Sequence, residues 1–504
     1  MSLMTSLPSS RGSSPDQQQM EKEGDVSSQL SAGDTRHERE DIADLQELSD
    51  DLKALDEQTE RAGRAMVFKR NKYIFLLQSM LLGMAYSMVW PTLLKYILWD
   101  AASPFRSEVN HGSSLSWNST SKWDRLVYGM TYIAYPLGSM VSASLVDKMN
   151  FGTRSTKRMI IFLNMFEIIG NLLFTVSLVP FLPAVGRFIA GLGDAFYVVL
   201  MREMHRYTEL SNERLTIECL AAFVLGVILS PGVNILTTFM HFELFGLRFN
   251  ENNFPGLTIA VIFIVMQFVV AIFVRETGSD EEDEPQINQQ EPSTLSKFHE
   301  ATDYITELEY TAWFVNGFSF IYTYIVGLFE LVIPFLMYQR LKASPIGVML
   351  LYAIIGTVYA MFLLMTMTVS FEYQPEVFVC MSVVVEIAGL VAVMFFSWLT
   401  QYTVAADIVG MAVVALAVSA LWSVDDVLFI NLVQVFVPHH QKEKSHKVRK
   451  FVSKVAFALA GLTVPVMYPS MLFYLLPVLI VMVCVLFINF TIVKYLVSTT
   501  KKPL

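Results

Sequence analysis

From residue 72 onward the sequence is a succession of long apolar runs separated by short polar segments. Most runs contain about 18 to 30 residues, which is enough for an α-helix to cross a hydrocarbon core about 30 Å thick. We predict twelve spans, over residues 72–98, 126–146, 159–179, 182–204, 216–240, 257–274, 310–338, 346–370, 375–399, 404–437, 452–467 and 471–497. The sequence therefore predicts an all-α membrane protein.

A polar, acidic segment at residues 276–307 divides the spans into two groups of six. We expect a disordered acidic cytosolic tail (1–68), a first bundle (72–275), a cytosolic linker (276–307), a second bundle (308–497) and a short cytosolic tail (498–504). The halves are weakly similar: VWPTLLKY ending the first span aligns with VIPFLMYQ ending the seventh. This internal symmetry predicts two pseudo-symmetric six-helix bundles that handle a substrate between them, near the membrane midplane.

Composition and motifs exclude several other classes. The net charge of −10 comes mostly from the first tail and the acidic linker, which argues against nucleic acid as a partner. The three cysteines have no metal-binding spacing, so neither a disulfide framework nor a zinc site is indicated. The sequence also lacks the phosphate-binding loop and the hydrolase signatures. We therefore expect that the protein is not an enzyme and that it binds no cofactor and no metal.

Basic residues indicate which loops face the cytosol, because cytoplasmic loops retain Lys and Arg. They collect after the second and tenth predicted spans: Lys148, Arg154, Lys157 and Arg158, then Lys442, Lys444, Lys447, Arg449 and Lys450. The loop at residues 99–125 then lies on the opposite side. It contains Asn118 in the sequence Asn-Ser-Thr, an acceptor for N-glycosylation.

One carboxylate lies within the fourth predicted span, in AGLGDAFYVVLMRE. A charged side chain at the bilayer centre costs about 3 kcal/mol on insertion scales, so Asp194 is not expected to face lipid. Arg187 precedes it by seven residues, which places both on one face of a continuous helix, about 10 Å apart. Two interpretations of Arg187 are equally supported: a transport role, or a polar lock between helices.

Further ionisable residues lie in the second half. Glu330 comes four residues before Pro334, where the proline frees a backbone carbonyl and bends the helix. Asp425 and Asp426 lie in the tenth span; neighbours in sequence cannot share one helix face, so at most one is expected to act in transport. Carboxylates in a low-dielectric site become proton acceptors. The candidates for proton coupling are Asp194, Arg187, Glu330, Asp425 and Asp426.

Several motifs resemble those of the major facilitator superfamily. ASLVDKMNFGTRSTKR resembles its loop between the second and third helices, with Asp147, Lys148, Gly152 and Arg154 as the gating-loop residues. Ala143 replaces the first glycine of that pattern, and Gly152 comes late. GRFIAGLGDA and GVILSPG resemble helix-packing motifs of the fourth and fifth helices, with Gly191, Gly193, Gly226 and Pro231 in the packing positions. The resemblance implies a two-bundle transporter fold.

Within that superfamily the chain is similar to a lysosomal group, the major facilitator domain-containing protein eight or neuronal ceroid lipofuscinosis type seven group. The residues that carry the likeness are Trp90, Pro91, Leu94, Lys95, Arg187, Arg202 and LFELVIPFLM at 328–337. The tail departs from the group because it lacks an acidic dileucine sorting signal. The likeness implies a lysosomal or endosomal membrane, with the plasma membrane as the alternative.

These observations predict a secondary transporter that moves a small molecule or ion by alternating access, coupled to protons, as a monomeric unit in the bilayer. A passive anion (chloride) conductance, which the resemblance suggests, and a membrane scaffold without flux are the alternatives. No set of side chains identifies the substrate. A conductance would persist without a proton gradient, coupled transport would stop, and a scaffold would show no flux.

We predict that Asn118 is glycosylated in cells, because it lies in the only long non-cytosolic loop of the first half. Enzymatic deglycosylation should increase the gel mobility of the wild type and leave Asn118→Gln unchanged. A wild type whose mobility does not change would contradict the prediction.

Overall fold

The structure is a computed structural model. It describes residues 69–97, 122–148, 156–176, 179–196, 198–200, 212–244, 247–275, 310–340, 342–372, 386–391, 408–420, 441–467 and 477–484, together with isolated residues elsewhere. The chain divides into a unit Met1–Met66 and a unit Val67–Leu504. In the first unit residues 51–53 are helical and Leu52 and Leu55 are exposed, as expected for a solvated helix.

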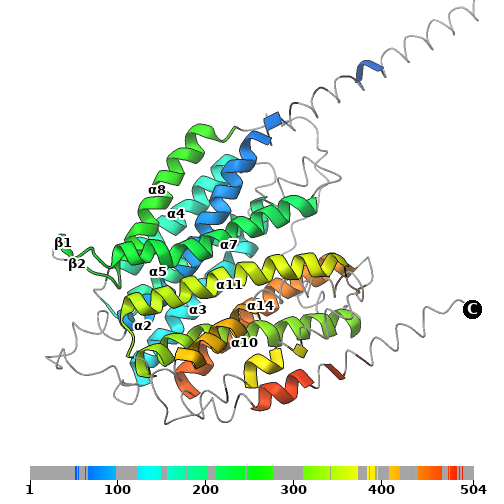
Figure 1. The fold of residues 1–504 in the computed structure, drawn as a ribbon. Helices are drawn as coiled ribbons and strands as arrows, with labels where there is room; N and C mark the ends of the chain where they lie inside the picture. The colour runs from blue at the N-terminus through cyan, green and yellow to red at the C-terminus, as the bar shows by residue number, and fades with distance from the viewer. Residues whose placement is uncertain are drawn as a thin grey trace, which may run out of the picture. The chain divides into compact units, whose positions relative to one another are not determined.

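The described part of the second unit consists almost entirely of helices (Figure 1). In the first half they are Lys69–Lys95, whose last part is α2 (Trp90–Lys95), then α3 (Lys122–Lys148), α4 (Thr156–Thr175), α5 (Leu182–Gly191), the 3₁₀ helix η5 (Leu192–Ala195), α7 (Asn212–Thr237) and α8 (Phe254–Phe273). In the second half they are α10 (Tyr310–Arg340), α11 (Pro345–Glu372), a shorter helix Ile408–Ala420 and α14 (Lys442–Met467). Seven helices in the described residues are long and apolar enough to cross a membrane.

A β-hairpin between α7 and α8 was not predicted from the sequence. Strands β1 (Phe242–Leu244) and β2 (Leu247–Phe249) pair antiparallel, and Phe242 lies opposite Phe249 with the two rings stacked 4.9 Å apart. Each strand has only three residues, too few for an alternating pattern to be distinguished from an apolar loop. The hairpin connects the end of α7 to the start of α8.

Four prolines lie inside the described long helices, Pro136, Pro231, Pro334 and Pro465, and side chains donate to two of the carbonyls that they free, those of Val227 and Glu330. Pro231 lacks the N–H that would bond Val227 O, and the hydroxyls of Ser87 and Ser230 lie 3.4 and 3.3 Å from that oxygen. The two hydroxyls are also bonded to each other at 2.5 Å, so one of them donates within the pair and the other can donate to Val227 O. Pro334 likewise frees the carbonyl of Glu330. In a bilayer every buried backbone group must be bonded within the protein, so these substitutes allow the helices to bend.

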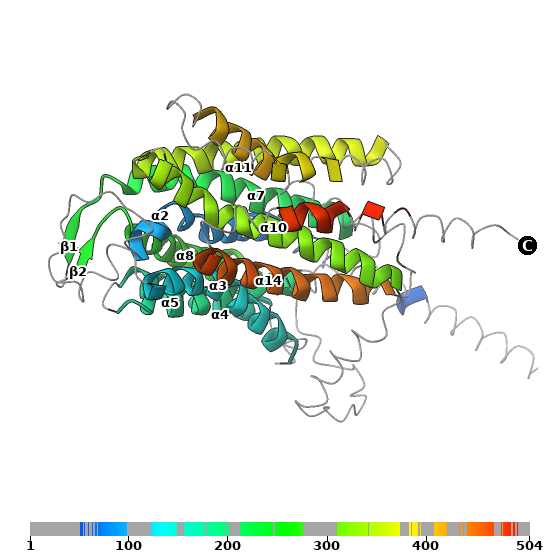
Figure 2. The same ribbon diagram turned by 90° about the horizontal axis from the view of Figure 1, so that it is seen from below.

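Helices from the two halves pack directly against each other, α3 on α14 and α7 on α11 (Figures 1 and 2). A Cβ built on Gly129 of α3 would lie 2.3 Å from the carbonyl oxygen of Gly461 in α14, so the backbones are in contact there. In the second pair, a Cβ on Gly356 would lie 3.3 Å from Cα of Ile228. Only glycine permits the first of these approaches.

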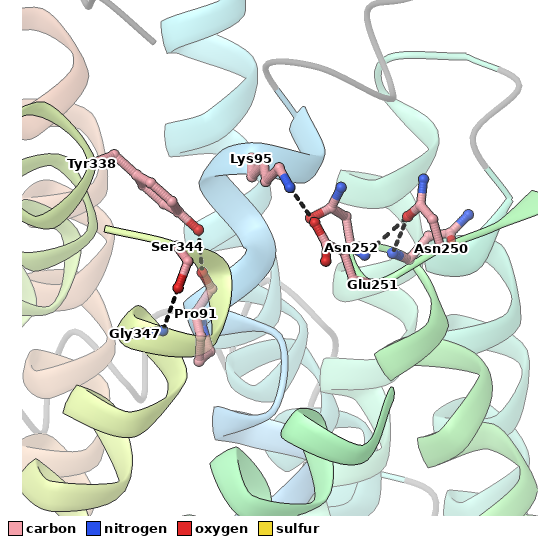
Figure 3. A network of polar contacts seen from close by, with 9 residues as sticks. Pro91, Lys95, Asn250, Glu251, Asn252, Tyr338, Ser344 and Gly347 are labelled. Atoms are coloured by element: carbon pink, nitrogen blue, oxygen red, sulfur yellow. Dashed lines mark hydrogen bonds and ion pairs between the residues drawn. The ribbon is translucent and has the colours of Figure 1, made fainter. Parts of the chain in front are cut away.

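We call the end of the helices at which α2 lies, α3 begins and α10 ends the closed end. Here the Tyr338 hydroxyl at the end of α10 donates to the Pro91 carbonyl at 3.3 Å (Figure 3). The ring of Phe335 also lies 5.3 Å from that of Tyr128. Beside this contact Lys95 forms an ion pair with Glu251, which attaches α2 to the segment preceding α8. On the topology predicted from the basic loops, the closed end faces away from the cytosol.

We expect Gly129→Ala to destabilise the protein by about 1–3 kcal/mol, because the added methyl would lie 2.3 Å from the backbone carbonyl oxygen of Gly461. The matched control is Gly317→Ala in α10, where an added Cβ meets nothing within 4 Å. Alanine is the better helix former by about 0.5–1 kcal/mol, so this variant should be at least as stable as the wild type. Thermal unfolding of the purified proteins in detergent compares them, and equal stability of the two variants would contradict the packing described.

Candidate functional site

Asp194 lies in η5, between the two halves of the protein. Its Oδ2 accepts a hydrogen bond from the Ser139 hydroxyl of α3 and lies 3.4 Å from Nζ of Lys454 in α14. The side chains of Asp194 and Lys454 are 22% and 31% exposed, so this ion pair is only partly buried. The two charges belong to different halves and join them near the middle of their helices.

Lys454 is a site residue that the sequence analysis missed. The predicted eleventh span began at residue 452, which made Lys454 a residue of the helix end, where a lysine extends to the interface. The structure begins this helix ten residues earlier, at Lys442, so that Lys454 lies near the middle of 26 residues. One signal was available: the apolar run 452–467 is too short to cross a bilayer as a helix unless the helix starts before it.

Arg187 is buried within the first half. Its guanidinium donates to the carbonyls of Ala85 at 3.1 Å and Tyr86 at 3.4 Å, both in the first span. It also lies over the ring of Tyr135 from α3, 4.4 Å from the ring centroid. The Tyr135 hydroxyl donates in turn to Glu167 of α4 at 3.2 Å. The network therefore ties four helices of the first half together.

The winding of the fourth span changes between Arg187 and Asp194. A continuous α-helix would place them on one face, but α5 ends at Gly191 and the next residues are wound as 3₁₀ helix. Three 3₁₀ residues complete a full turn, whereas three α-helical residues fall about 60° short of one. The two side chains therefore stay within about 40° of each other around the helix axis. Their partners differ nevertheless: Arg187 bonds the first span, and Asp194 bonds Ser139 of α3 and Lys454 of the opposite half.

The glycines of the predicted packing motif lie at close helix contacts. A Cβ on Gly191 would lie 2.2 Å from the carbonyl oxygen of Tyr135, and one on Gly226 would lie 1.9 Å from that of Met80. A Cβ on Gly193 would lie 2.6 Å from Cγ of Glu167. The backbone of η5 is therefore pressed against α4, next to Asp194.

Glu330 of α10 is buried and also joins the two halves. Its carboxylate accepts a hydrogen bond from the hydroxyl of Tyr132 in α3. Its carbonyl, which Pro334 frees, accepts one from the Tyr352 hydroxyl of α11 at 2.9 Å. This second contact of a carboxylate with the opposite half lies between the ion pair and the closed end.

Several predicted residues lie outside the described part. They are Asn118, Gly152, Arg154, Asp425 and Asp426. Asp147 and Lys148 end α3, but their side chains are not described. Within the described residues no group of three His, Cys, Asp or Glu side chains is placed to hold a metal ion.

Comparison with known proteins supports the fold but not a specific family. No protein-family profile and no curated protein matches the chain. Among solved structures, a POT family transporter in complex with 5-aminolevulinic acid has a TM-score of 0.61 at 12% identity, over 84% of this chain and 96% of that chain. The nucleoside transporter NupG has a TM-score of 0.59 at 12% identity, over 85% and 99%.

The xylose transporter XylE from E. coli, in an inward-open conformation, matches with a TM-score of 0.57 at 12% identity, over 84% of this chain and 96% of that chain. The chain therefore has a fold of the major-facilitator type, and the predicted fold class is confirmed. At this level of identity the likeness concerns the fold alone. The narrower resemblance to the lysosomal group stays a prediction.

We expect Arg187 and Asp194 to differ in their effect on stability. Arg187→Met removes two hydrogen bonds from a charged donor and should cost about 1–3 kcal/mol. Asp194→Asn keeps an acceptor for Ser139 and loses only a partly exposed ion pair, which is worth less than about 1 kcal/mol. Thermal unfolding in detergent measures the loss of stability in the two variants. A larger loss in Asp194→Asn than in Arg187→Met would contradict the role of Arg187 in holding the helices together.

Proposed function

We propose that this chain is a proton-coupled secondary transporter that moves a small solute by alternating access of its two halves. The observation that carries the proposal is the ion pair between Asp194 and Lys454, which joins the halves midway along their helices and remains partly exposed. The major-facilitator type of fold supports it, since such folds handle substrate between two bundles near the midplane.

The contacts at the closed end hold the two halves together on that side of the protein. The backbone contact of Gly129 with Gly461 and the bond from Tyr338 to Pro91 both link the two halves at that end. A passive conductance needs a continuous path through the membrane, and close packing of backbones at one end opposes such a path. These contacts therefore favour alternating access over the anion conductance.

In this proposal Asp194 carries the coupling proton. Protonation of its carboxyl removes the charge that faces Lys454 and weakens the attraction between the halves. Glu330, which accepts from Tyr132 of the other half, would act as a second contact that breaks when the closed end opens. Arg187 would hold the helices of the first half together as a rigid body. Asp425 and Asp426 remain candidates from sequence.

The sequence resemblance supports a lysosomal or endosomal membrane as the location, and a monomeric transport unit. We retain the division into bundles at 72–275 and 308–497 with an acidic cytosolic linker between them. Immunofluorescence of the tagged full-length protein against lysosomal and plasma-membrane markers tests the location.

We predict that Asp194→Asn abolishes solute uptake driven by a pH gradient, because asparagine resembles the protonated carboxyl and does not titrate. Exchange of solute for solute should be less affected, since it requires no net proton movement. The assay is flux into proteoliposomes with a panel of sugars, amino acids and organic anions, with and without a pH gradient. The control is Glu243→Gln, which removes an exposed carboxylate in β1.

Normal uptake by Asp194→Asn with unchanged pH dependence would contradict the coupling role of this residue. Absence of flux by the wild type for the whole panel would contradict transport itself.

A further inference from the structure

We propose that Lys454 binds the carboxylate group of the substrate, and that the substrate class is small organic monocarboxylates carried together with one proton. This inference rests on the proposed function, because it names the substrate of the same site. It starts from the ion pair of Lys454 with Asp194, the carboxylate of the other half, at 3.4 Å.

Charge balance leads to the class of substrate. A solute that passes between the halves must separate Lys454 from Asp194, and each of these partly exposed charges then loses the attraction of its partner. A proton on Asp194 neutralises that side, and a monoanion replaces Asp194 as the partner of Lys454. The pair has zero net charge before binding, and the protonated site with its bound monoanion also has zero net charge.

The same balance makes the coupling obligatory. With a proton alone Lys454 has no counter-charge, and with an anion alone the site holds two negative charges and one positive charge. Both half-loaded forms are disfavoured, so the halves move when the site is empty or fully loaded. Transport of one monoanion with one proton is then electroneutral and independent of the membrane potential.

The hydrogen-bonding groups at the site fit a carboxylate. A carboxylate has two oxygens that each accept hydrogen bonds. The ammonium of Lys454 offers donors from one half. Once Asp194 is protonated, its O–H and the Ser139 hydroxyl offer donors from the other half. One carboxylate can therefore bridge the halves through the positions at which the ion pair now joins them.

The other charged and titratable groups around Asp194 already have partners of their own. They are Arg187 on α5, Glu167 on α4, and Tyr135 on α3 and Tyr86 on the first span. Arg187 is bonded to backbone carbonyls and covered by the Tyr135 ring, and Glu167 accepts from the Tyr135 hydroxyl and Asn171. Lys454 is thus the partly exposed cation in direct contact with Asp194.

The simpler explanation is that the pair only holds the helices together. The chain provides a matched comparison, since Lys72 and Glu218 also form an ion pair, with side chains 29% and 27% exposed, within the first half. A purely structural role predicts that loss of Lys72 or of Lys454 has similar consequences. A binding role predicts an effect of added carboxylate that only Lys454 variants lose.

The test is binding to purified full-length protein, measured as thermal stabilisation in detergent at pH 5.5 and 7.5. The probes are sodium acetate, lactate and benzoate, with sodium chloride and glucose as comparison solutes at equal ionic strength. We expect at least one monocarboxylate to stabilise the wild type, more strongly at pH 5.5. Its apparent affinity should fall at least tenfold in Lys454→Gln, be partly retained in Lys454→Arg, and be unchanged in Lys72→Gln.

Binding that survives in Lys454→Gln, equal stabilisation by chloride and by the carboxylates, or stabilisation by glucose alone would overturn the inference. The assay needs no flux, so it is separate from the test of transport. Lys454-dependent carboxylate binding without wild-type flux would retain this site and reject the transporter. Flux of a neutral sugar that is unchanged in Lys454→Gln would retain the transporter and reject this site.

Discussion

The ion pair between Asp194 and Lys454 is the interaction on which the account depends, because it places opposite charges from two halves of the protein beside each other at mid-helix. Both charges are only partly exposed, so each is less favourable without its partner than with it. Whatever separates the halves must supply a proton to one side and an anion to the other. The coupling of proton and substrate follows from this requirement.

Two features of the surrounding helices bear on a movement of the halves: side chains that bond the carbonyls freed by proline, and close packing of helices at glycine. Proline residues free a carbonyl, which a side chain from another helix then satisfies, as Tyr352 does for Glu330 and Ser87 does for Val227. Glycine at 129 brings α3 into backbone contact with α14. The first half is held together internally by Arg187, so it is suited to move as one body.

The sequence predicts the helices from the length of the apolar runs. It also predicts the polar residues within them, because a charged residue inside an apolar run of membrane-spanning length can be recognised from the sequence alone. Asp194 and Glu330 were identified in this way. Lys454 was missed because it lies near the edge of an apolar run, although the helix extends well beyond that run. The partners of Arg187 were also not predictable, since they depend on contacts between segments distant in sequence.

The most direct measurement is the distance between the halves at the closed end as a function of pH. Spin labels at Leu126→Cys in α3 and Val466→Cys in α14, both exposed positions, would report it by pulsed electron resonance in a background without other cysteines. With a monocarboxylate that the site binds present, the account predicts a longer-distance population that grows as the pH falls and that is present at every pH in Asp194→Asn. A single short distance that changes neither with pH nor with this substitution would contradict the account.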